Sequence, residues 1–449
     1  MNLSWVGRKV AVLGTGKTGA SLLDAVLASG AEISVWDTRA DLDLPSWQRR
    51  YPGVRFHFGP MEPAALLTQD LVLCSPGISP LTPAIARARH AGIPVWGDVE
   101  LFAQHAQAPI IAITGSNGKS TVTTLVGKIL QAAGRRVAVG GNLGTPALEL
   151  LPKAGEAEAE LYVLELSSFQ LEYSESLCPK AAVILNITPD HLDWHGDFAA
   201  YVAAKWRIAR RMGAGDFLLL HGEDPVFREI PALCPDLAVE FFGQGQATEL
   251  RQGILMVAGE PLLPAAQLSM AGRHNQENAL AAARLARQLG APDAAIIQTL
   301  REFVGLPHRL QWVAKVHGVD YYDDSKATNV GASLRAIASL PAPLVLILGG
   351  DAKGADLQPL QEVCAGQRAA VLLGKDEERL AEILDGVLPL HRTGRQGMTE
   401  VVRQAANLAQ PGDRVLLSPA CASLDMFVDY QDRGRQFAAA VARLAEGSL

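Results

Sequence analysis

Short apolar runs alternate along this chain with Ala- and Leu-rich stretches of helical period, and glycine-containing turns separate the two. This alternation is typical of parallel strands joined by crossover helices. We therefore expect an α/β fold in three blocks, each a mostly parallel sheet with flanking helices. The predicted strands are 9–13, 32–36, 71–74 and 93–96, then 109–113, 162–164, 182–185 and 217–220, and finally 319–322, 344–348, 370–373 and 414–417.

The joints between the blocks fall near residues 98 and 305. We expect the first and third blocks to be Rossmann-like and the central block to be a P-loop-type ATPase fold, and the central block also carries a predicted helix at 198–212 and predicted short hairpins within 241–267. A length of 449 residues fits this division, because domains cluster near ~100–200 residues. The predicted domains are 1–98, 99–305 and 306–449.

Composition narrows the class of protein. The formal net charge is −7, which gives no overall attraction for nucleic acid or anionic lipid. The longest apolar runs, such as 344–348, are far shorter than the ~20 residues that span a bilayer. The five cysteines are scattered without metal-binding spacing. We expect a cytoplasmic monomer whose partners are small molecules, with no nucleic acid and no membrane among them.

A first glycine loop, Gly14-x-Gly16-x-x-Gly19, follows a predicted strand and opens a helix, and Asp37 ends the next strand. This is the context of a dinucleotide-binding fingerprint, in which the helix N-terminus attracts a pyrophosphate. Read alone, the loop favours NAD. The physics specifies only a diphosphate near a helix start and an acid near a sugar or base, so a nucleotide-diphosphate sugar also fits.

A second glycine loop, Thr114 to Thr121 (TGSNGKST), lies between a strand and a helix. Its backbone amides can hold phosphates, Lys119 can reach the terminal phosphates, and Ser120 can ligate Mg²⁺. The standard spacing requires a glycine where Ile113 stands, so the loop is a shortened form. The context indicates a nucleotide-binding site.

Ten segments now occur in an order that resembles the Mur ligases, the ATP-dependent amide ligases of peptidoglycan precursor synthesis. The versions LELSSFQL, DDSKATN and SPACASLD are similar to those of the members that add D-glutamate to UDP-N-acetylmuramoyl-L-alanine. The segments cover essentially the whole chain: TGSNGKST, VGGNLG (139–144), LELSSFQL (164–171), TPDHLD (188–193), YVAAK (201–205), GRHNQEN (272–278), GLPHR (305–309), DDSKATN (323–329), GGDAKG (349–354) and SPACASLD (418–425).

The resemblance implies that ATP, as co-substrate, converts a carboxylate into an acyl phosphate, which the amine of D-glutamate then attacks. It implies two Mg²⁺ ions and the catalytic residues Lys119, Glu165, His191 and Lys205. The implied metal ligands are Ser120, Glu165, His191 and Lys205, the last as a carbamate formed with CO₂. From the residues alone, Glu165 also fits a buried acid paired with Arg or Lys, His191 a structural histidine, and Lys205 a surface lysine.

The same resemblance assigns the remaining ligand contacts. ATP is assigned to Gly115, Ser116, Asn117, Gly118, Lys119, Ser120, Thr121, Asn275, Asn278, Arg309, Asp324 and Lys326. The uridine substrate is assigned to Thr18, Asp37, Thr38, Arg39, Ser75, Gly77 and Asn142. D-Glutamate is assigned to Thr328, Lys353, Ser423, Leu424 and Tyr430. Helix capping is the alternative for Asn275 and Asn278, Gln311 stands where relatives often carry Glu, and Cys421 fits core packing better than a nucleophile.

The sequence leaves three alternative functions open. The first is a related amide ligase, either another Mur enzyme or a folylpolyglutamate synthase. The second is an NAD-dependent oxidoreductase built on Gly14 to Gly19. The third is an inactive nucleotide-binding scaffold, against which Lys119, Glu165, His191 and Lys205 argue.

Overall fold

The computed structural model describes residues 5–153, 155–228, 230, 234–270 and 272–448. The chain divides into two compact units, and the division passes through one helix, α10 (Arg273–Gln288). Unit 1 comprises residues 1–266 and 277–300, and unit 2 comprises 267–276 and 301–449. Within the described part of the chain, no helix is both long enough and apolar enough to cross a membrane.

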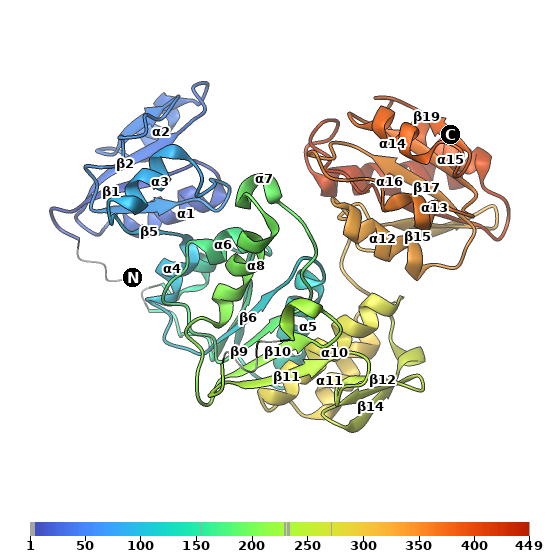
Figure 1. Ribbon diagram of the computed structural model, residues 1–449, viewed down its shortest axis with the longest axis horizontal. Helices are drawn as coiled ribbons and strands as arrows, with labels where there is room; N and C mark the ends of the chain where they lie inside the picture. Colours follow the sequence, from blue (N-terminus) through green and yellow to red (C-terminus); the bar gives the residue numbers. More distant parts are fainter. Residues whose placement is uncertain (1–4, 154, 229, 231–233, 271, 449) are drawn as a thin grey trace. The chain divides into compact units, whose positions relative to one another are not determined.

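The first sheet of unit 1 has five parallel strands in the order β3-β2-β1-β4-β5. Figure 1 shows this sheet in blue, with β1, β2 and β5 labelled. Continuous burial of residues 10–13 of β1 and of all of β4 explains their unbroken apolar sequences. The strands are β1 (Lys9–Leu13), β2 (Glu32–Asp37), β3 (Arg55–Phe58), β4 (Leu71–Cys74) and β5 (Val95–Trp96), and the helices are α1 (Lys17–Val26), α2 (Leu44–Arg50), α3 (Pro83–His90) and α4 (Asp98–Ala103).

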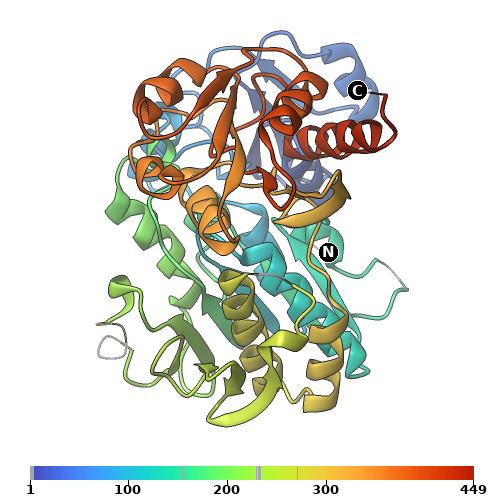
Figure 2. The same cartoon turned by 90° about the vertical axis from the view of Figure 1, so that its right-hand side faces the viewer.

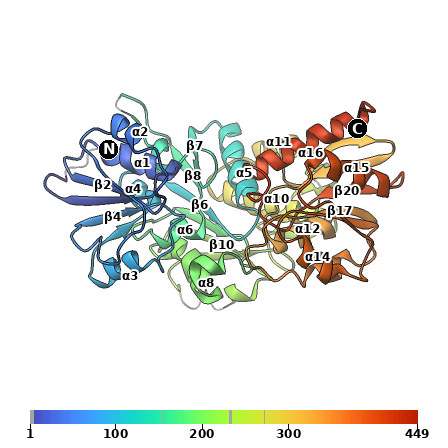
Figure 3. The same cartoon turned by 90° about the horizontal axis from the view of Figure 1, so that it is seen from above.

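The central sheet has six parallel strands in the order β11-β10-β9-β6-β8-β7, and Figure 3 shows β6, β8 and β7 side by side. Its strands are β6 (Ile110–Thr114), β7 (Val137–Gly141), β8 (Leu161–Glu165), β9 (Ala181–Ile184), β10 (Phe217–His221) and β11 (Ala238–Phe242). An antiparallel sheet follows, with β12 (Glu249–Arg251), β13 (Ile254–Val257) and β14 (Glu260–Pro264). The α-helices are α5 (Lys119–Ala132), α6 (Ser168–Glu172), α7 (Leu192–His195), α8 (Phe198–Trp206), α10 and α11 (Asp293–Glu302), and the 3₁₀ turns are η1 (Ala147–Leu150), η2 (Arg207–Ala209), η3 (Pro225–Phe227) and η4 (Ala265–Gln267).

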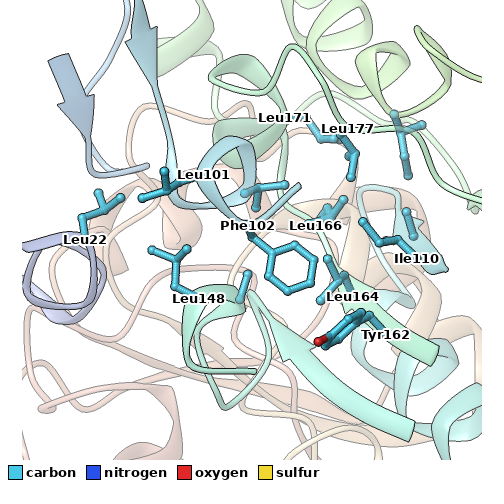
Figure 4. Close-up of a cluster of buried hydrophobic side chains, with 14 of the residues drawn as sticks. Leu22, Leu101, Phe102, Ile110, Leu148, Tyr162, Leu164, Leu166, Leu171 and Leu177 are labelled. Atoms are coloured by element: carbon cyan, nitrogen blue, oxygen red, sulfur yellow. The ribbon is translucent and has the colours of Figure 1, made fainter. Parts of the chain in front are cut away.

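One hydrophobic core connects the first and central sheets of unit 1. Figure 4 shows Leu22 from α1, Phe102 from α4, Leu148 from η1 and Tyr162 from β8 in the same cluster. The rings of Phe102 and Tyr162 meet edge to face with centroids 5.0 Å apart. Close-packed interiors deform little, so this core holds the loops of the first sheet at fixed positions relative to the loops of the central sheet.

Unit 2 is built on a six-stranded sheet in the order β15-β16-β20-β17-β18-β19, parallel except for β15. The chain finishes on the long helix α16, shown in dark red in Figure 2. The strands are β15 (Gln311–Val316), β16 (Val319–Asp323), β17 (Leu344–Gly349), β18 (Ala369–Leu373), β19 (Leu390–Arg392) and β20 (Arg414–Leu417), and the helices are α12 (Val330–Ser339), α13 (Leu360–Cys364), α14 (Glu377–Leu384), α15 (Met398–Leu408) and α16 (Tyr430–Ala445).

The structure confirms the predicted α/β fold with three mostly parallel sheets, and the hairpins predicted within 241–267 are present as β12 to β14. The helix predicted at 198–212 is wrong in its length. The α-helix ends at Trp206 and tightens into the 3₁₀ turn η2, which ends at Ala209 before Gly213. Such tightening is common where a helix runs out of hydrogen-bond partners.

Candidate active site

A pocket of about 440 Å³ opens in unit 1 where the loops after β1, β4, β7 and β8 meet. The strand order of the first sheet reverses between β1 and β4, and parallel α/β sheets bind ligands at such a switch point. Four residues predicted to hold the uridine substrate line this pocket, namely Thr18, Ser75, Gly77 and Asn142.

The other predicted uridine-site residues, Asp37, Thr38 and Arg39, lie at the end of β2. Asp37 is buried and accepts hydrogen bonds from the Thr15 amide (2.9 Å), the Thr15 hydroxyl (2.8 Å) and Nη2 of Arg39 (2.8 Å). Burial raises the pKa of the Asp37 carboxyl, but the hydrogen bonds from Arg39 and Thr15 outweigh it and hold that pKa well below its usual value. An ionised Asp37 therefore anchors the first glycine loop, while Thr38 and Arg39 are exposed.

The second glycine loop connects β6 to α5. Gly118 is the N-cap of α5 at φ 86°, in the left-handed region that favours glycine. The Asn117 amide donates to Oδ1 of Asn186 (2.9 Å), and the Ser116 hydroxyl forms a hydrogen bond with the Tyr201 hydroxyl (2.8 Å). Ser120 and Thr121 are buried in the first turn of α5. Side chains from the loop after β9 and from α8 thus hold the glycine loop in place ahead of any ligand.

Two lysines converge on one carbonyl of this loop. Nζ of Lys119 donates to the carbonyl oxygens of Gly115 (2.8 Å) and Ser116 (2.9 Å), and Nζ of Lys205 donates to the Gly115 oxygen (2.9 Å). Lys205 is 1% exposed, and its Nζ lies 4.7 Å from the centre of the Tyr201 ring. Burial, and after it the Lys119 ammonium, hold the pKa of Lys205 well below its usual value, although Asp190 and Glu165 act in the opposite direction.

Glu165 ends β8 and is paired in register with Ile113 of β6, immediately before the loop. Its Oε1 accepts a hydrogen bond from Nδ2 of Asn142 (2.7 Å). Its Oε2 is buried and has no hydrogen-bond partner among the described residues. A buried carboxylate oxygen left in this state is costly unless a cation meets it, so Glu165 fits the role of a Mg²⁺ ligand.

His191 lies on the loop before α7 at φ 54°, a backbone region uncommon outside glycine. Its Nε2 is 3.7 Å from Oδ2 of Asp190, and its ring meets Phe169 edge to face with centroids 4.7 Å apart. Among the described residues, no three or more His, Cys, Asp or Glu side chains form a cluster that could hold a metal ion. The structure therefore does not gather His191 and Glu165 into such a cluster.

The predicted adenine contacts lie on α10, three residues apart. Both Asn275 and Asn278 are buried. Asn278 faces the second glycine loop, because a Cβ added to Gly118 would lie 2.4 Å from its Oδ1. A side chain at position 118 would therefore collide with the side-chain amide of Asn278, and glycine avoids this collision.

In unit 2, the predicted ATP residues Arg309, Asp324 and Lys326 lie around the end of β16. Asp324 is buried and accepts hydrogen bonds from the Ser418 hydroxyl (2.8 Å) and the Leu310 amide (3.1 Å). Burial raises its pKa to about 7, against the opposing effect of these bonds and of Arg309. Nζ of Lys326 lies 3.9 Å from the centre of the Tyr430 ring, a cation–π contact between two predicted ligand residues.

The predicted D-glutamate residues come from several loops of unit 2. Lys353 and Ser423 follow β17 and β20, which are neighbouring strands, and a backbone bridge between Asp351 and Ala422 joins their loops. Ser423 is buried, whereas Leu424 and Lys353 are exposed. Thr328 follows β16, and Tyr430 begins α16.

The structure thus gathers Lys119, Lys205 and Glu165 in one place and Thr18, Ser75, Gly77 and Asn142 in another. Sequence reasoning missed the residues that hold these groups, above all Tyr201 and Asn186. Tyr201 carried a signal, because it opens the YVAAK segment four residues before Lys205 and so shares its helix face. Asn186 gave no signal, since its role depends on a contact across the sheet.

Comparison with family models matches three parts of the chain. Residues 8–97 match the Mur ligase MurD-like N-terminal domain, residues 113–286 the Mur ligase middle domain, and residues 308–421 the Mur ligase glutamate ligase domain.

Curated relatives are similar along nearly the whole length. The chain is 46% identical over 450 residues to the UDP-N-acetylmuramoylalanine–D-glutamate ligase of Methylococcus capsulatus, covering 98% of this chain and 96% of that protein. It is 47% identical over 451 residues to the ligase of the same name from Pseudomonas putida, covering 97% of each chain.

Solved structures share the fold at lower identity. The UDP-N-acetylmuramate-alanine ligase MurC of Thermotoga maritima superposes with a TM-score of 0.59 at 18% identity, covering 97% of this chain and 99% of that one. The MurF ligase of Thermotoga maritima, solved in complex with ADP, gives a TM-score of 0.60 at 17% identity, covering 100% of this chain and 96% of the other.

Proposed function

The chain belongs to the Mur ligase family, and we propose that its residues carry out the family's reaction through an acyl phosphate. It joins D-glutamate to UDP-N-acetylmuramoyl-L-alanine in peptidoglycan synthesis, and it depends on ATP. The observation that carries the proposed chemistry is the convergence of Lys119 and Lys205 on the Gly115 carbonyl. Glu165 acts electrostatically on Lys205, and its Oε2 has no hydrogen-bond partner in the described part of the chain.

The first step transfers the terminal phosphoryl group of ATP to the alanyl carboxylate of the uridine substrate, and ADP leaves. The amine of D-glutamate then attacks the acyl carbon, and inorganic phosphate leaves as the amide forms. Both steps develop negative charge on phosphoryl oxygens, which positively charged groups stabilise. In the structure the Lys119 ammonium donates hydrogen bonds to two loop carbonyls. A phosphate that displaces these carbonyls would form an ion pair with the ammonium.

Magnesium would be held by Ser120, Glu165, His191 and a carbamate on Lys205, and two ions are proposed. When bound, it neutralises phosphate charge. The depressed pKa favours the neutral amine of Lys205, and that amine can attack CO₂, forming an N–C bond and releasing one proton. The product is an anion, which places a negative charge beside the Lys119 ammonium that meets the same carbonyl.

The remaining assignments follow the same scheme. We assign the uridine substrate to 1–98 with Asn142, ATP to 99–305 with Arg309, Asp324 and Lys326, and D-glutamate to 306–449. The pocket supports the first assignment, because its lining combines residues of the first sheet with Asn142. A cytoplasmic monomer is proposed, and the five unpaired cysteines accord with a reducing compartment.

ADP release tests the proposed function. The purified protein receives ATP, Mg²⁺, UDP-N-acetylmuramoyl-L-alanine and D-glutamate, and each is omitted in turn. We expect ADP only in the complete mixture, and no comparable release when L-alanine, L-lysine or L-glutamate replaces D-glutamate. Preference for one of those amino acids would indicate a related amide ligase. A melting shift with NAD and none with UDP would support the oxidoreductase alternative instead.

A further inference from the structure

Lys17 stands out in the lining of the pocket of unit 1. Among the described residues that line the pocket, it alone carries a formal charge. The predicted uridine-substrate contacts that share the lining, Thr18, Ser75, Gly77 and Asn142, are all neutral. A substrate with a diphosphate brings two negative charges into this pocket, and neutral donors alone neutralise neither of them.

The position of the Lys17 ammonium is defined by a contact between two sheets. Lys17 is the first residue of α1, directly after Gly16 of the first glycine loop. Its Nζ donates a hydrogen bond of 2.8 Å to the carbonyl oxygen of Gly144, in the loop after β7 of the central sheet. Both Lys17 and Gly144 line the pocket, so the bond lies at its wall.

The loop that accepts this bond also forms a hydrogen bond with the carboxylate of Glu165, the proposed Mg²⁺ ligand. The Gly141 amide donates to the Thr145 carbonyl (2.8 Å) and closes the loop, and Asn142 within it donates to Oε1 of Glu165 (2.7 Å). Lys17 therefore ties the first glycine loop to a segment bonded to the proposed Mg²⁺ ligand.

Two further features at this wall favour an anion. The N-cap of α1, Gly16, has an extended backbone and provides no side-chain cap, which leaves first-turn amides for a ligand. The hydroxyl oxygen of Ser75 is buried without a hydrogen-bond partner among the described residues. An ammonium group has three donors, so Lys17 can bind a phosphate oxygen while it keeps the Gly144 carbonyl.

We propose that Lys17 is the cation that binds the diphosphate of the uridine substrate and holds the loop of Gly144 and Asn142 against it. The inference rests on the proposed function and deepens it, because it names the charge that recognises a diphosphate in a pocket otherwise lined by neutral residues. Lys17 lies outside every set of contacts that the motifs predicted, and its charge and its bond to Gly144 carry the inference.

The test compares Lys17→Met and Lys17→Arg with the wild type. Lys128→Met is the matched control, because it removes an exposed lysine from α5 of the same unit. Calorimetric titration measures the affinity for UDP-N-acetylmuramoyl-L-alanine and for UDP, and steady-state ADP release gives KM and kcat. We expect Lys17→Met to weaken both ligands, and to raise KM for the uridine substrate, by roughly 10- to 100-fold, the range for a lost charge-assisted bond.

The proposal predicts a different pattern from a merely structural role of Lys17. If Lys17 binds the diphosphate, kcat, KM for ATP and the melting temperature of Lys17→Met should match those of the control. Lys17→Arg should keep the affinity within about threefold of the wild type, because it keeps the charge. Unchanged UDP affinity in Lys17→Met, or equal loss in Lys17→Arg, would overturn the role of Lys17 while leaving the ligase activity of the wild type intact. A wild type that neither binds the uridine substrate nor releases ADP would overturn the proposed function itself.

Discussion

Two glycine loops of unit 1 follow the same local pattern and reach different arrangements. Each follows a buried strand, and each places a lysine at the first position of the next helix, Lys17 in α1 and Lys119 in α5. Lys119 folds back onto the carbonyls of its own loop, whereas Lys17 reaches the Gly144 carbonyl in the loop after β7 of the central sheet. The backbone differs at the caps, since Gly16 is extended and Gly118 is left-handed.

The surroundings of the two lysines explain why one pattern can serve two purposes. Lys119 lies beside Lys205, on which Glu165 and Asp190 also act, and such a set of charges is suited to phosphoryl transfer. Lys17 lies among neutral residues in a pocket, which suits binding without chemistry. A glycine loop therefore indicates a phosphate, and the side chains that other strands bring to it decide what happens to that phosphate.

The largest effect is expected from Lys119→Met. Loss of the charge that stabilises the transferring phosphoryl group should lower kcat by roughly 1,000-fold. Lys17→Met, by contrast, should raise KM for the uridine substrate and leave kcat in place. Steady-state ADP release at saturating substrates measures the difference, with Lys128→Met as the control. A kcat for Lys119→Met within tenfold of the wild type would break the comparison.

Lys205→Ala should come next, with a fall in turnover of at least ~100-fold, because a proposed anionic ligand is lost. Formate or acetate should restore part of the activity by supplying a carboxylate to the space left behind. Rates are measured with increasing concentrations of each acid, and with chloride as the ionic control. Full activity without added acid would remove the carbamate hypothesis.

The two cap glycines should respond differently to a methyl group. In Gly118→Ala the left-handed backbone costs ~1–2 kcal/mol, and the new Cβ would lie 2.4 Å from Oδ1 of Asn278. We expect a lower melting temperature and a KM for ATP raised about tenfold. Gly16→Ala meets no atom of the described chain within 4 Å, so its melting temperature should stay unchanged. Equal destabilisation of both variants would contradict the difference in backbone.

The smallest effect concerns how the loops are anchored. Ionised Asp37 holds Thr15 of the first loop, whereas neutral Asn186 holds Asn117 of the second. Because the folded pKa of Asp37 lies below its unfolded value, its contribution to stability is present above about pH 4 and is lost as the pH falls further. Asp37→Asn should therefore cost about 1–2 kcal/mol at pH 7 and much less near pH 2.

Asn186→Ala provides the contrast, since its cost should be the same at both pH values. Chemical denaturation of the three proteins at pH 7 and near pH 2 measures these differences. A cost of Asp37→Asn that does not change with pH would show that the carboxylate is not the anchor.

The sequence predicts the interior of the fold better than its borders. Buried strands such as β1 and β17 have continuous apolar runs, and these were located to within a residue or two. The strands that the pattern does not predict, β3, β7, β11, β15 and β19, lie at the edges of their sheets and are only partly buried. Edge strands are short and do not require an apolar sequence on both faces, so periodicity gives little sign of them.

For the candidate site, motifs predict which residues carry chemistry but not which residues hold them. Lys119 and Glu165 follow from their positions after predicted strands, and their assigned roles stay predictions. The bond from Lys17 to Gly144 joins residues 127 positions apart, and it exists because a common core sets the first sheet beside the central one. Contacts of this kind depend on packing between sheets, which no local pattern encodes.

One crossed titration tests most directly the claim that each loop serves its own nucleotide. Lys17→Met and Lys119→Met are each titrated with UDP-N-acetylmuramoyl-L-alanine and with a non-hydrolysable ATP analogue plus Mg²⁺. The account predicts that Lys17→Met loses affinity for the uridine substrate and keeps the ATP analogue, and that Lys119→Met loses affinity for the analogue and keeps the uridine substrate. Loss of the same ligand in both variants would contradict it.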